Sequence, residues 1–205
     1  QQIQAQREAE QAQRHESAQD QAQQQWDSAS PVGEHAYLTA KGVQGYGLRQ
    51  QGDMLLVPLR DVSGTLHSLQ TIDASGNKRF LAGGKVQGCF HSIGQPDGCI
   101  VVCEGFATGA SIHAATGHTV ACAMNAGNLQ TVAMALHAKY PSLQIVIAAD
   151  DDHATEGNPG RTAARQAALS VGGMVAVPLF DANRPAKATD FNDLHQLQGL
   201  DAVKA

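Results

Sequence analysis

The stretch LQIVIAADDD, residues 143–152, decides the fold of this chain. Its first part is apolar and rich in β-branched residues, as in a fully buried strand, and a cluster of aspartates follows at once. In an open α/β sheet, ligands bind in the crevice beyond the carboxyl ends of the strands. We therefore expect the aspartates at that edge of a sheet. Because side chains alternate along a strand, Asp150 and Asp152 should point to one side and Asp151 to the other.

This acidic strand end suits a divalent cation. Two carboxylates on one side repel each other unless a cation lies between them. Hard oxygen ligands with room for water and phosphate suit Mg²⁺, and Mn²⁺ is an alternative. A simpler interpretation is an acidic loop that caps the next helix. A second acidic site weighs against that simpler interpretation.

The second site is the stretch IVVCEGFATG, residues 100–109. Another buried strand ends here in a single acid, Glu104, which is followed by Gly105 and a helix-like pattern. Repeated strand and helix patterns with short links predict a parallel sheet with right-handed crossovers. Glu104, Asp150 and Asp152 are therefore expected at one edge of that sheet.

In this order and spacing, the acids resemble the TOPRIM fold shared by DnaG-type primases, topoisomerases and some nucleases. The family pattern is a strand ending in Glu-Gly, a strand ending in Asp-x-Asp, and a glycine turn into a helix carrying Arg or Lys. Here Glu104-Gly105, residues 150–152 and residues 158–161 hold those places. The resemblance implies an α/β fold with a parallel four-stranded sheet flanked by helices. The expected strands are residues 99–103, 119–123, 143–149 and 174–177.

Three domains are expected along the chain. Residues 1–30 are Gln-rich and polar and predict a helix or linker, with Trp26 anchoring its end. Residues 31–98 predict a small, mainly antiparallel α+β subdomain. It comprises a short helix (35–43), a hairpin (54–61 with 65–73) and strands within 78–84 and 89–94. Residues 99–205 form the TOPRIM domain with a C-terminal helix.

The small subdomain also resembles DnaG-type primases. Residues 58–61 (PLRD) and 78–81 (KRFL) hold the places of two primase strands, and residues 37–43 (YLTAKGV) resemble plasmid and phage primases more closely. Those primases also carry an acidic stretch after the last strand, here residues 190–194 (DFNDL). For Asp190 and Asp193, helix capping and a role near the metal remain equal alternatives.

Composition limits the other possibilities. The chain has 205 residues, 42% hydrophobic, and a formal net charge of -5, so nucleic-acid binding must come from local patches. The sequence contains no apolar run near the roughly 18 residues of a membrane span and no signal peptide, which predicts a cytoplasmic protein without membrane contact. The four cysteines show no metal-binding spacing and are interpreted as reduced core residues. The first residue is not Met, and we expect a fragment of a longer protein.

The primase resemblance implies nucleotidyl transfer on single-stranded DNA, with nucleoside triphosphates as substrates. Asp150 and Asp152 would hold Mg²⁺, Glu104 would be a ligand or general base, and Asp151, Asp190 and Asp193 would be ligands or lie behind them. Binding the phosphates of the nucleic acid and the triphosphate also requires cationic side chains. The first candidates are Lys78, Arg79 and Lys85, and the second are Arg60 and Arg161.

Two other functions remain open at the level of sequence. One is a TOPRIM nuclease or topoisomerase-like enzyme that uses the same acids. The other is a non-catalytic nucleic-acid-binding module of a larger plasmid or phage replication or conjugation protein. The implied partners are further domains of the parent chain, such as a helicase, a zinc-binding module or a relaxase.

Overall fold

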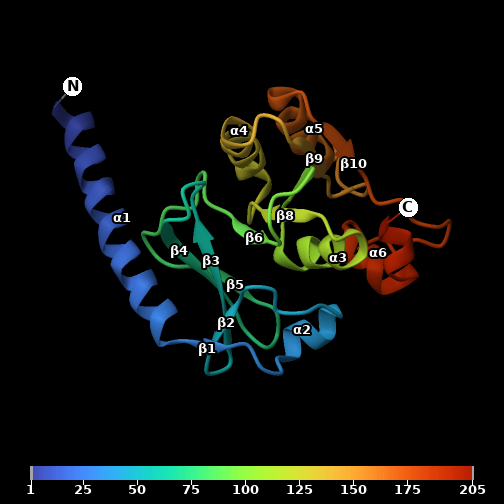
Figure 1. The fold of residues 1–205 in the computed structure, drawn as a ribbon, viewed down its shortest axis with the longest axis horizontal. Coiled ribbons are helices and arrows are strands. Elements are labelled where there is room, and N and C mark those ends of the chain that lie inside the picture. Colours follow the sequence, from blue (N-terminus) through green and yellow to red (C-terminus); the bar gives the residue numbers. More distant parts are fainter. Residues whose placement is uncertain (1, 205) are drawn as a thin grey trace.

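The computed structural model describes residues 2–204 and contains two five-stranded sheets (Figure 1). The first sheet is antiparallel, in the order β1-β2-β3-β4-β5. It is built around the predicted hairpin, whose strands bury apolar side chains such as Leu55, Val57 and Ile72. Its strands are β1 (Ser30–Pro31), β2 (Arg49–Gln51), β3 (Met54–Arg60), β4 (Leu66–Ile72) and β5 (Lys78–Phe80).

The second sheet has the order β10-β9-β7-β8-β6, and its first four strands are parallel, as predicted. Side chains such as Ile147 and Val102 are completely buried, and each such burial is worth roughly 1.5–3 kcal/mol. The strands are β6 (His91–Ile93), β7 (Cys99–Cys103), β8 (Thr119–Cys122), β9 (Gln144–Ala148) and β10 (Met174–Ala176).

The placement of β6 differs from the sequence-based expectation. We assigned residues 89–94 to the antiparallel subdomain, but β6 pairs antiparallel with β8 and extends the second sheet. The buried Asn128 side chain fixes this arrangement, because its amide donates to the carbonyl oxygens of Cys89 and Ala123 at 2.9 Å each. A backbone bridge between Arg60 and Phe90 then joins the two sheets. The boundary between the subdomains therefore falls before β6.

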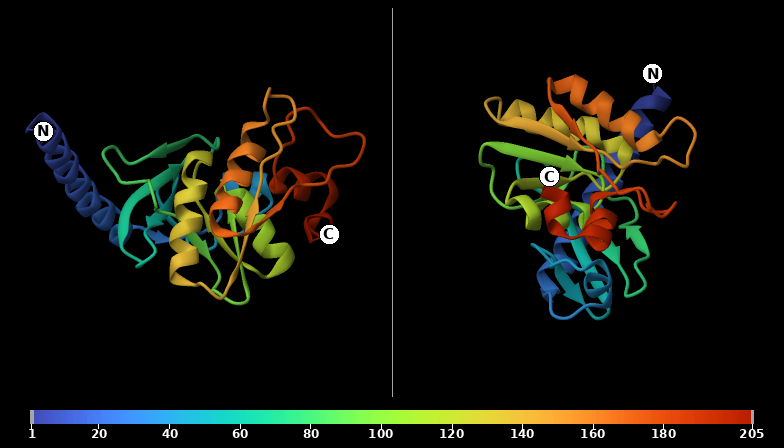
Figure 2. Two further views of the ribbon diagram at one scale, coloured as in Figure 1. Left: turned by 90° about the horizontal axis from the view of Figure 1, so that it is seen from above. Right: turned by 90° about the vertical axis from the view of Figure 1, so that its right-hand side faces the viewer.

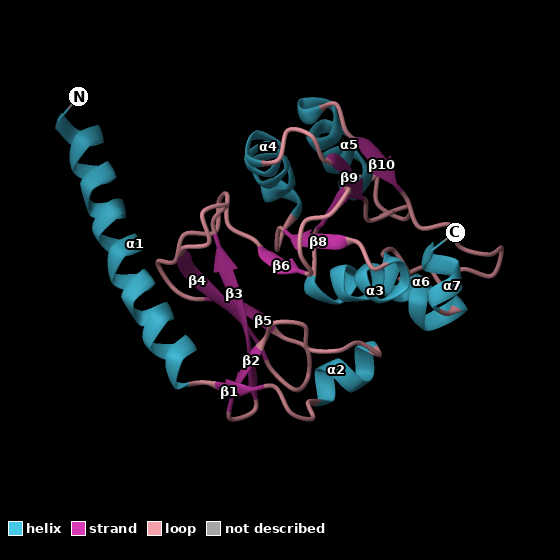
Figure 3. Ribbon diagram, in the orientation of Figure 1, coloured by secondary structure: helices cyan, strands magenta, loops and turns pink. Residues whose placement is uncertain are grey.

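Helices cover both faces of the second sheet (Figures 1 and 3). Two of them, α4 (Leu129–Lys139) and α5 (Pro159–Val171), pack on each other and on one face. On the other face, α3 (Phe106–Thr116) packs against the C-terminal helices α6 (Phe191–Gln198) and α7 (Leu200–Lys204). A single turn of 3-10 helix, η1 (Ala126–Asn128), leads into α4. The carboxyl ends of β7 and β9 lie at the same edge of this sheet.

The N-terminal residues form one long helix, α1 (Gln2–Ser28), which extends away from the body (Figure 2). It touches the first sheet through the buried Ala18 and Ala22, and Trp26 packs beside them. The short helix α2 (Ala36–Lys41) ends at Gly42, whose φ of 61° suits glycine. Within the described residues, no helix has the length and apolar character needed to cross a membrane. Three of the cysteines are buried free thiols and Cys99 is half-buried, as predicted.

Candidate active site

The predicted acids meet at the carboxyl ends of two neighbouring strands. β7 and β9 are paired in parallel, with Val102 opposite Ile147, so that both chains leave the sheet at the same edge. Glu104 follows directly after β7 and Asp150 comes shortly after β9. Both side chains are half-buried. The parallel register, which the buried apolar runs impose, thus brings together acids that lie far apart in the sequence.

Asp150 is the most strongly perturbed of these acids. Its Oδ1 atom is buried and has no hydrogen-bond partner among the described residues. Burial, followed by the charges of Glu104 and Asp190, raises the pKa of its carboxyl from 3.8 to about 8. An acceptor oxygen that is buried, unpaired and close to other carboxylates is suited to bind a cation. The donor set therefore fits a divalent metal.

Glu104 and Lys78 face each other across the two sheets. Burial and the charge of Asp152 raise the pKa of the Glu104 carboxyl, while Lys78 acts in the opposite direction. Lys78 lies on β5, and much of its side chain is exposed, but its ammonium group is crowded by the surrounding protein. This desolvation, together with Lys41, lowers the pKa of Lys78, and the charges of Asp190, Glu104 and Asp150 oppose the decrease. The antiparallel sheet thus supplies a cation to the acidic edge.

Asp152 has two roles at this edge. Its Oδ2 atom accepts a hydrogen bond of 2.9 Å from the backbone N–H of Gly160, in the first turn of α5. A Cβ atom at Gly160 would lie only 2.5 Å from the backbone oxygen of Asp150, so the close approach requires glycine. The formal N-cap is Asn158, which has a φ of 42° and accepts from the N–H of Arg161. The capping interpretation is therefore correct for Asp152, although its charge also acts on Glu104.

Asp151 differs from the other two acids in that its carboxylate lies beside two arginine side chains. Its nearly buried carboxylate lies 2.5 Å from Nη1 of Arg184 and 2.9 Å from Nε of Arg161. It also accepts a hydrogen bond of 2.7 Å from the Asn158 side chain. Burial alone would raise the pKa of Asp151, but the hydrogen bonds from Arg184 and Asn158 outweigh it and hold the pKa below its usual value.

Asp190 and Asp193 form a capping box at the start of α6. The Asp190 carboxylate accepts from the N–H of Asp193 at 2.8 Å and from the Thr108 hydroxyl at 2.9 Å. Both acids also raise the pKa of Asp150, so they lie close enough for their charges to act on it. The capping alternative is therefore confirmed, and a role of these two acids near the metal stays a prediction.

The side chains do not close onto one point. Within residues 2–204, no group of three or more His, Cys, Asp or Glu side chains converges tightly enough to enclose a metal ion. Mg²⁺ often keeps several waters and uses only one or two protein carboxylates plus phosphate oxygens. An open acidic edge with Asp150 and Asp152 at its centre is compatible with that mode of binding.

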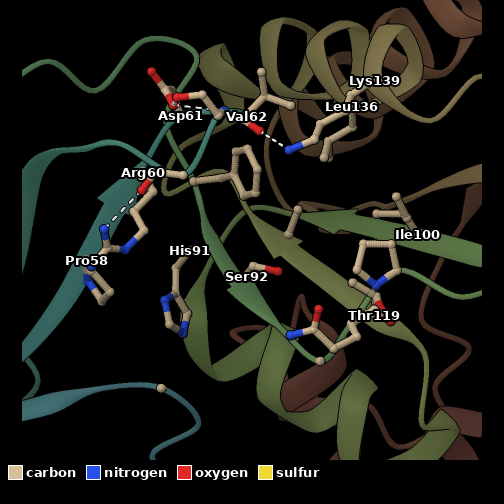
Figure 4. A pocket seen from close by; sticks show the side chains of 18 of the residues that line it. Pro58, Arg60, Asp61, Val62, His91, Ser92, Ile100, Thr119, Leu136 and Lys139 are labelled. Atoms are coloured by element: carbon tan, nitrogen blue, oxygen red, sulfur yellow. Dashed lines mark hydrogen bonds between the residues drawn. The ribbon is translucent and has the colours of Figure 1, made fainter.

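The other predicted cations lie elsewhere. Arg79 follows Lys78 on β5 and therefore points to the opposite face. Lys85 is in the loop after β5, and Arg161 faces Asp151. Arg60 lines a separate cavity of about 340 Å³ between the β3–β4 hairpin, β6 and α4 (Figure 4). Of the predicted cations, Lys78 is the one that the fold places beside Glu104 and Asp150.

Sequence reasoning missed Arg184, which makes the closest contact with the aspartate triplet. It lies in the irregular segment between β10 and α6, where no local pattern distinguishes it from a solvated arginine. Sequence reasoning also missed Thr108 on α3, whose hydroxyl donates to Asp190. The only available signal was the proximity of Arg184 to the DFNDL stretch.

Comparison with known proteins identifies the family. The profile of the Toprim domain matches residues 99–201, which include both acidic strand ends. The chain belongs to the Toprim domain family. Two proteins from Escherichia coli, both named DNA primase TraC, are similar to this Toprim chain. One is 40% identical over 184 residues (83% of this chain, 17% of the relative), and the other is 41% identical over 170 residues (77% and 12%).

Solved structures agree with this assignment. The primase fragment of the bacteriophage T7 primase-helicase protein has a TM-score of 0.56 at 19% identity, covering 86% of this chain and 78% of that one. A DnaG primase catalytic domain bound to single-stranded DNA has a TM-score of 0.56 at 10% identity, covering 93% and 78%. At these identities the structures show the fold. The predicted primase-like Toprim architecture is confirmed, and the chain spans less than a fifth of the curated relatives.

Proposed function

We propose that this chain is the catalytic core of a DNA primase, which makes short primers on single-stranded DNA by metal-dependent nucleotidyl transfer. The observation that carries the proposal is the buried, unpaired Oδ1 atom of Asp150, whose carboxyl lies within reach of the charges of Glu104, Asp152 and Lys78. Asp150 and Asp152, with Glu104 beside them, would hold Mg²⁺ or Mn²⁺. When bound, the metal lowers the pKa of the attacking hydroxyl and shields charge on the phosphate.

The residues of the chain then have distinct tasks. The 3′-oxygen of the primer attacks the α-phosphorus of a nucleoside triphosphate, and pyrophosphate leaves. Glu104 accepts the proton of the 3′-hydroxyl, and its raised pKa suits a general base. Lys78 contacts the triphosphate or the template backbone. Arg79, Lys85 and Arg60 extend the contact with nucleic acid, whereas Arg161 acts through Asp151.

The test is incorporation of labelled nucleotides on single-stranded DNA with Mg²⁺. Wild type is compared with Asp150→Asn and with Glu156→Gln, an exposed acid in the loop after the same strand end. We expect primers from wild type and Glu156→Gln and none from Asp150→Asn. Because the relatives are much longer, the full-length parent is assayed alongside. DNA binding without synthesis in both chain and parent would favour the non-catalytic module, and strand cleavage would favour the nuclease.

A further inference from the structure

We infer that Arg184 is a positioning residue, which holds the two acidic segments of the proposed metal site together. The inference rests on the proposed function, because it concerns the same site. The guanidinium donates three hydrogen bonds: Nη1 to Oδ2 of Asp151 at 2.5 Å, Nη2 to the backbone oxygen of Asp151 at 2.7 Å, and Nε to the backbone oxygen of Ala188 at 2.7 Å. It also stacks on Phe180, with its Cζ 4.3 Å from the ring centroid.

These contacts join two parts of the chain that both carry acids. Asp151 stands between Asp150 and Asp152 at the end of β9. Ala188 precedes Asp190 by two residues, and Thr189 accepts a further bond of 2.8 Å from the backbone N–H of Asp151. Arg184 therefore binds both the chain at the end of β9 and the segment that leads to Asp190.

A clamp is needed because the clamped groups repel each other. Asp150 and Asp190 carry like charges, and bringing two carboxylates together without a cation costs free energy. The segment between β10 and α6 has little regular structure to resist that repulsion. Arg184 provides a planar, permanently charged fork in a mostly buried position, with a side chain 15% exposed.

Arg161 is the matched control. It also lies beside Asp151, but its Nε atom is 2.9 Å away without hydrogen-bond alignment, and its side chain is 36% exposed. It belongs to α5 and makes no hydrogen bond to the segment before Asp190. Removing Arg161 therefore takes away one positive charge near Asp151 but leaves the hydrogen bonds between Asp151 and the segment before α6.

The test measures Mg²⁺ binding by calorimetry, without nucleotide, in wild type, Arg184→Ala, Arg184→Lys and Arg161→Ala. Loss of a residue that orients metal ligands costs about 10- to 100-fold in affinity, and we expect this for both Arg184 variants, with a smaller effect of Arg161→Ala. The lysine keeps the charge but cannot make three directed bonds. Wild-type affinity in either Arg184 variant, or equal losses at Arg184 and Arg161, would overturn the inference.

A metal-free measurement separates this inference from the proposed function. In Arg184→Lys, hydrogen exchange at the Asp151 amide should be about tenfold faster or more, because the bond to Thr189 opens locally. Exchange should be unchanged in Arg161→Ala. If wild type binds no Mg²⁺, the proposed function fails, and the exchange rates still decide whether Arg184 is the clamp. Unchanged exchange in Arg184→Lys would refute it.

Discussion

Replacing Asp150 by asparagine should make the metal-free protein more stable. The substitution keeps the shape of the side chain and removes the charge whose Oδ1 atom is buried and unpaired. The pKa of this carboxyl is raised from 3.8 to about 8, chiefly by burial and by Glu104. Each pKa unit is worth about 1.4 kcal/mol, so at pH 7 the carboxyl destabilises the fold by at most about 4 kcal/mol. Allowing for local relaxation, we expect a gain of about 2–4 kcal/mol.

The sign of the pH dependence follows from the direction of the shift. A carboxyl with a raised folded pKa binds its proton more tightly in the native state than in the unfolded state. Well below pH 4 both states are protonated and Asp150 costs no free energy. As the pH rises from about 4 to about 8, the native state loses stability, and above pH 8 the full penalty remains. The advantage of Asp150→Asn should therefore be small at pH 4 and largest above pH 8.

The assay is urea unfolding of wild type, Asp150→Asn and Glu156→Gln at pH 4.0, 6.0 and 8.0 (about two pH units apart, to sample this window), first in EDTA and then in Mg²⁺. A ligand at 100 times its Kd stabilises the protein that binds it by about 2.7 kcal/mol. Mg²⁺ should therefore reduce the difference in unfolding free energy between Asp150→Asn and wild type, because of these two only wild type binds it. Glu156 is exposed, and its variant should follow wild type. A pH-independent difference, or a loss of stability in Asp150→Asn, would refute the account of a repelling, metal-free carboxylate.

Three further outcomes follow from the same geometry. Asp152→Ala should lower the free energy of unfolding by about 1 kcal/mol, because it removes the acceptor for the Gly160 N–H; an increase in melting temperature would contradict the capping role. Gly160→Ala should cost more than about 2 kcal/mol through the 2.5 Å clash, checked by urea unfolding against Gly33→Ala, where the added Cβ meets nothing within 4 Å. A third variant replaces Lys78, Arg79 and Lys85 by alanine. Each lost phosphate contact should reduce the slope of log affinity for single-stranded DNA against log salt concentration by about 0.7. An unchanged slope would place the template elsewhere.

The sequence by itself determined the elements and the order of the acids. Buried apolar runs such as residues 143–149 are typical of central strands in a parallel sheet, so the parallel strands could be predicted. The position of Asp150 after such a run then placed it at the carboxyl edge. Helix ends were equally local, since Gly42 and the Asp190 capping box act within a few residues.

Only the tertiary structure decided which distant groups meet. A short strand such as β6 carries the same pattern whichever sheet it joins, and the free edge of β8 together with the Asn128 amide selected the second sheet. The local sequence determines the partners of charged side chains still less, because a solvated lysine and a catalytic lysine look alike in sequence. Packing of the two sheets brought Lys78 to Glu104, and the course of the chain after β10 brought Arg184 to Asp151, since long side chains find partners only where folded elements come into contact.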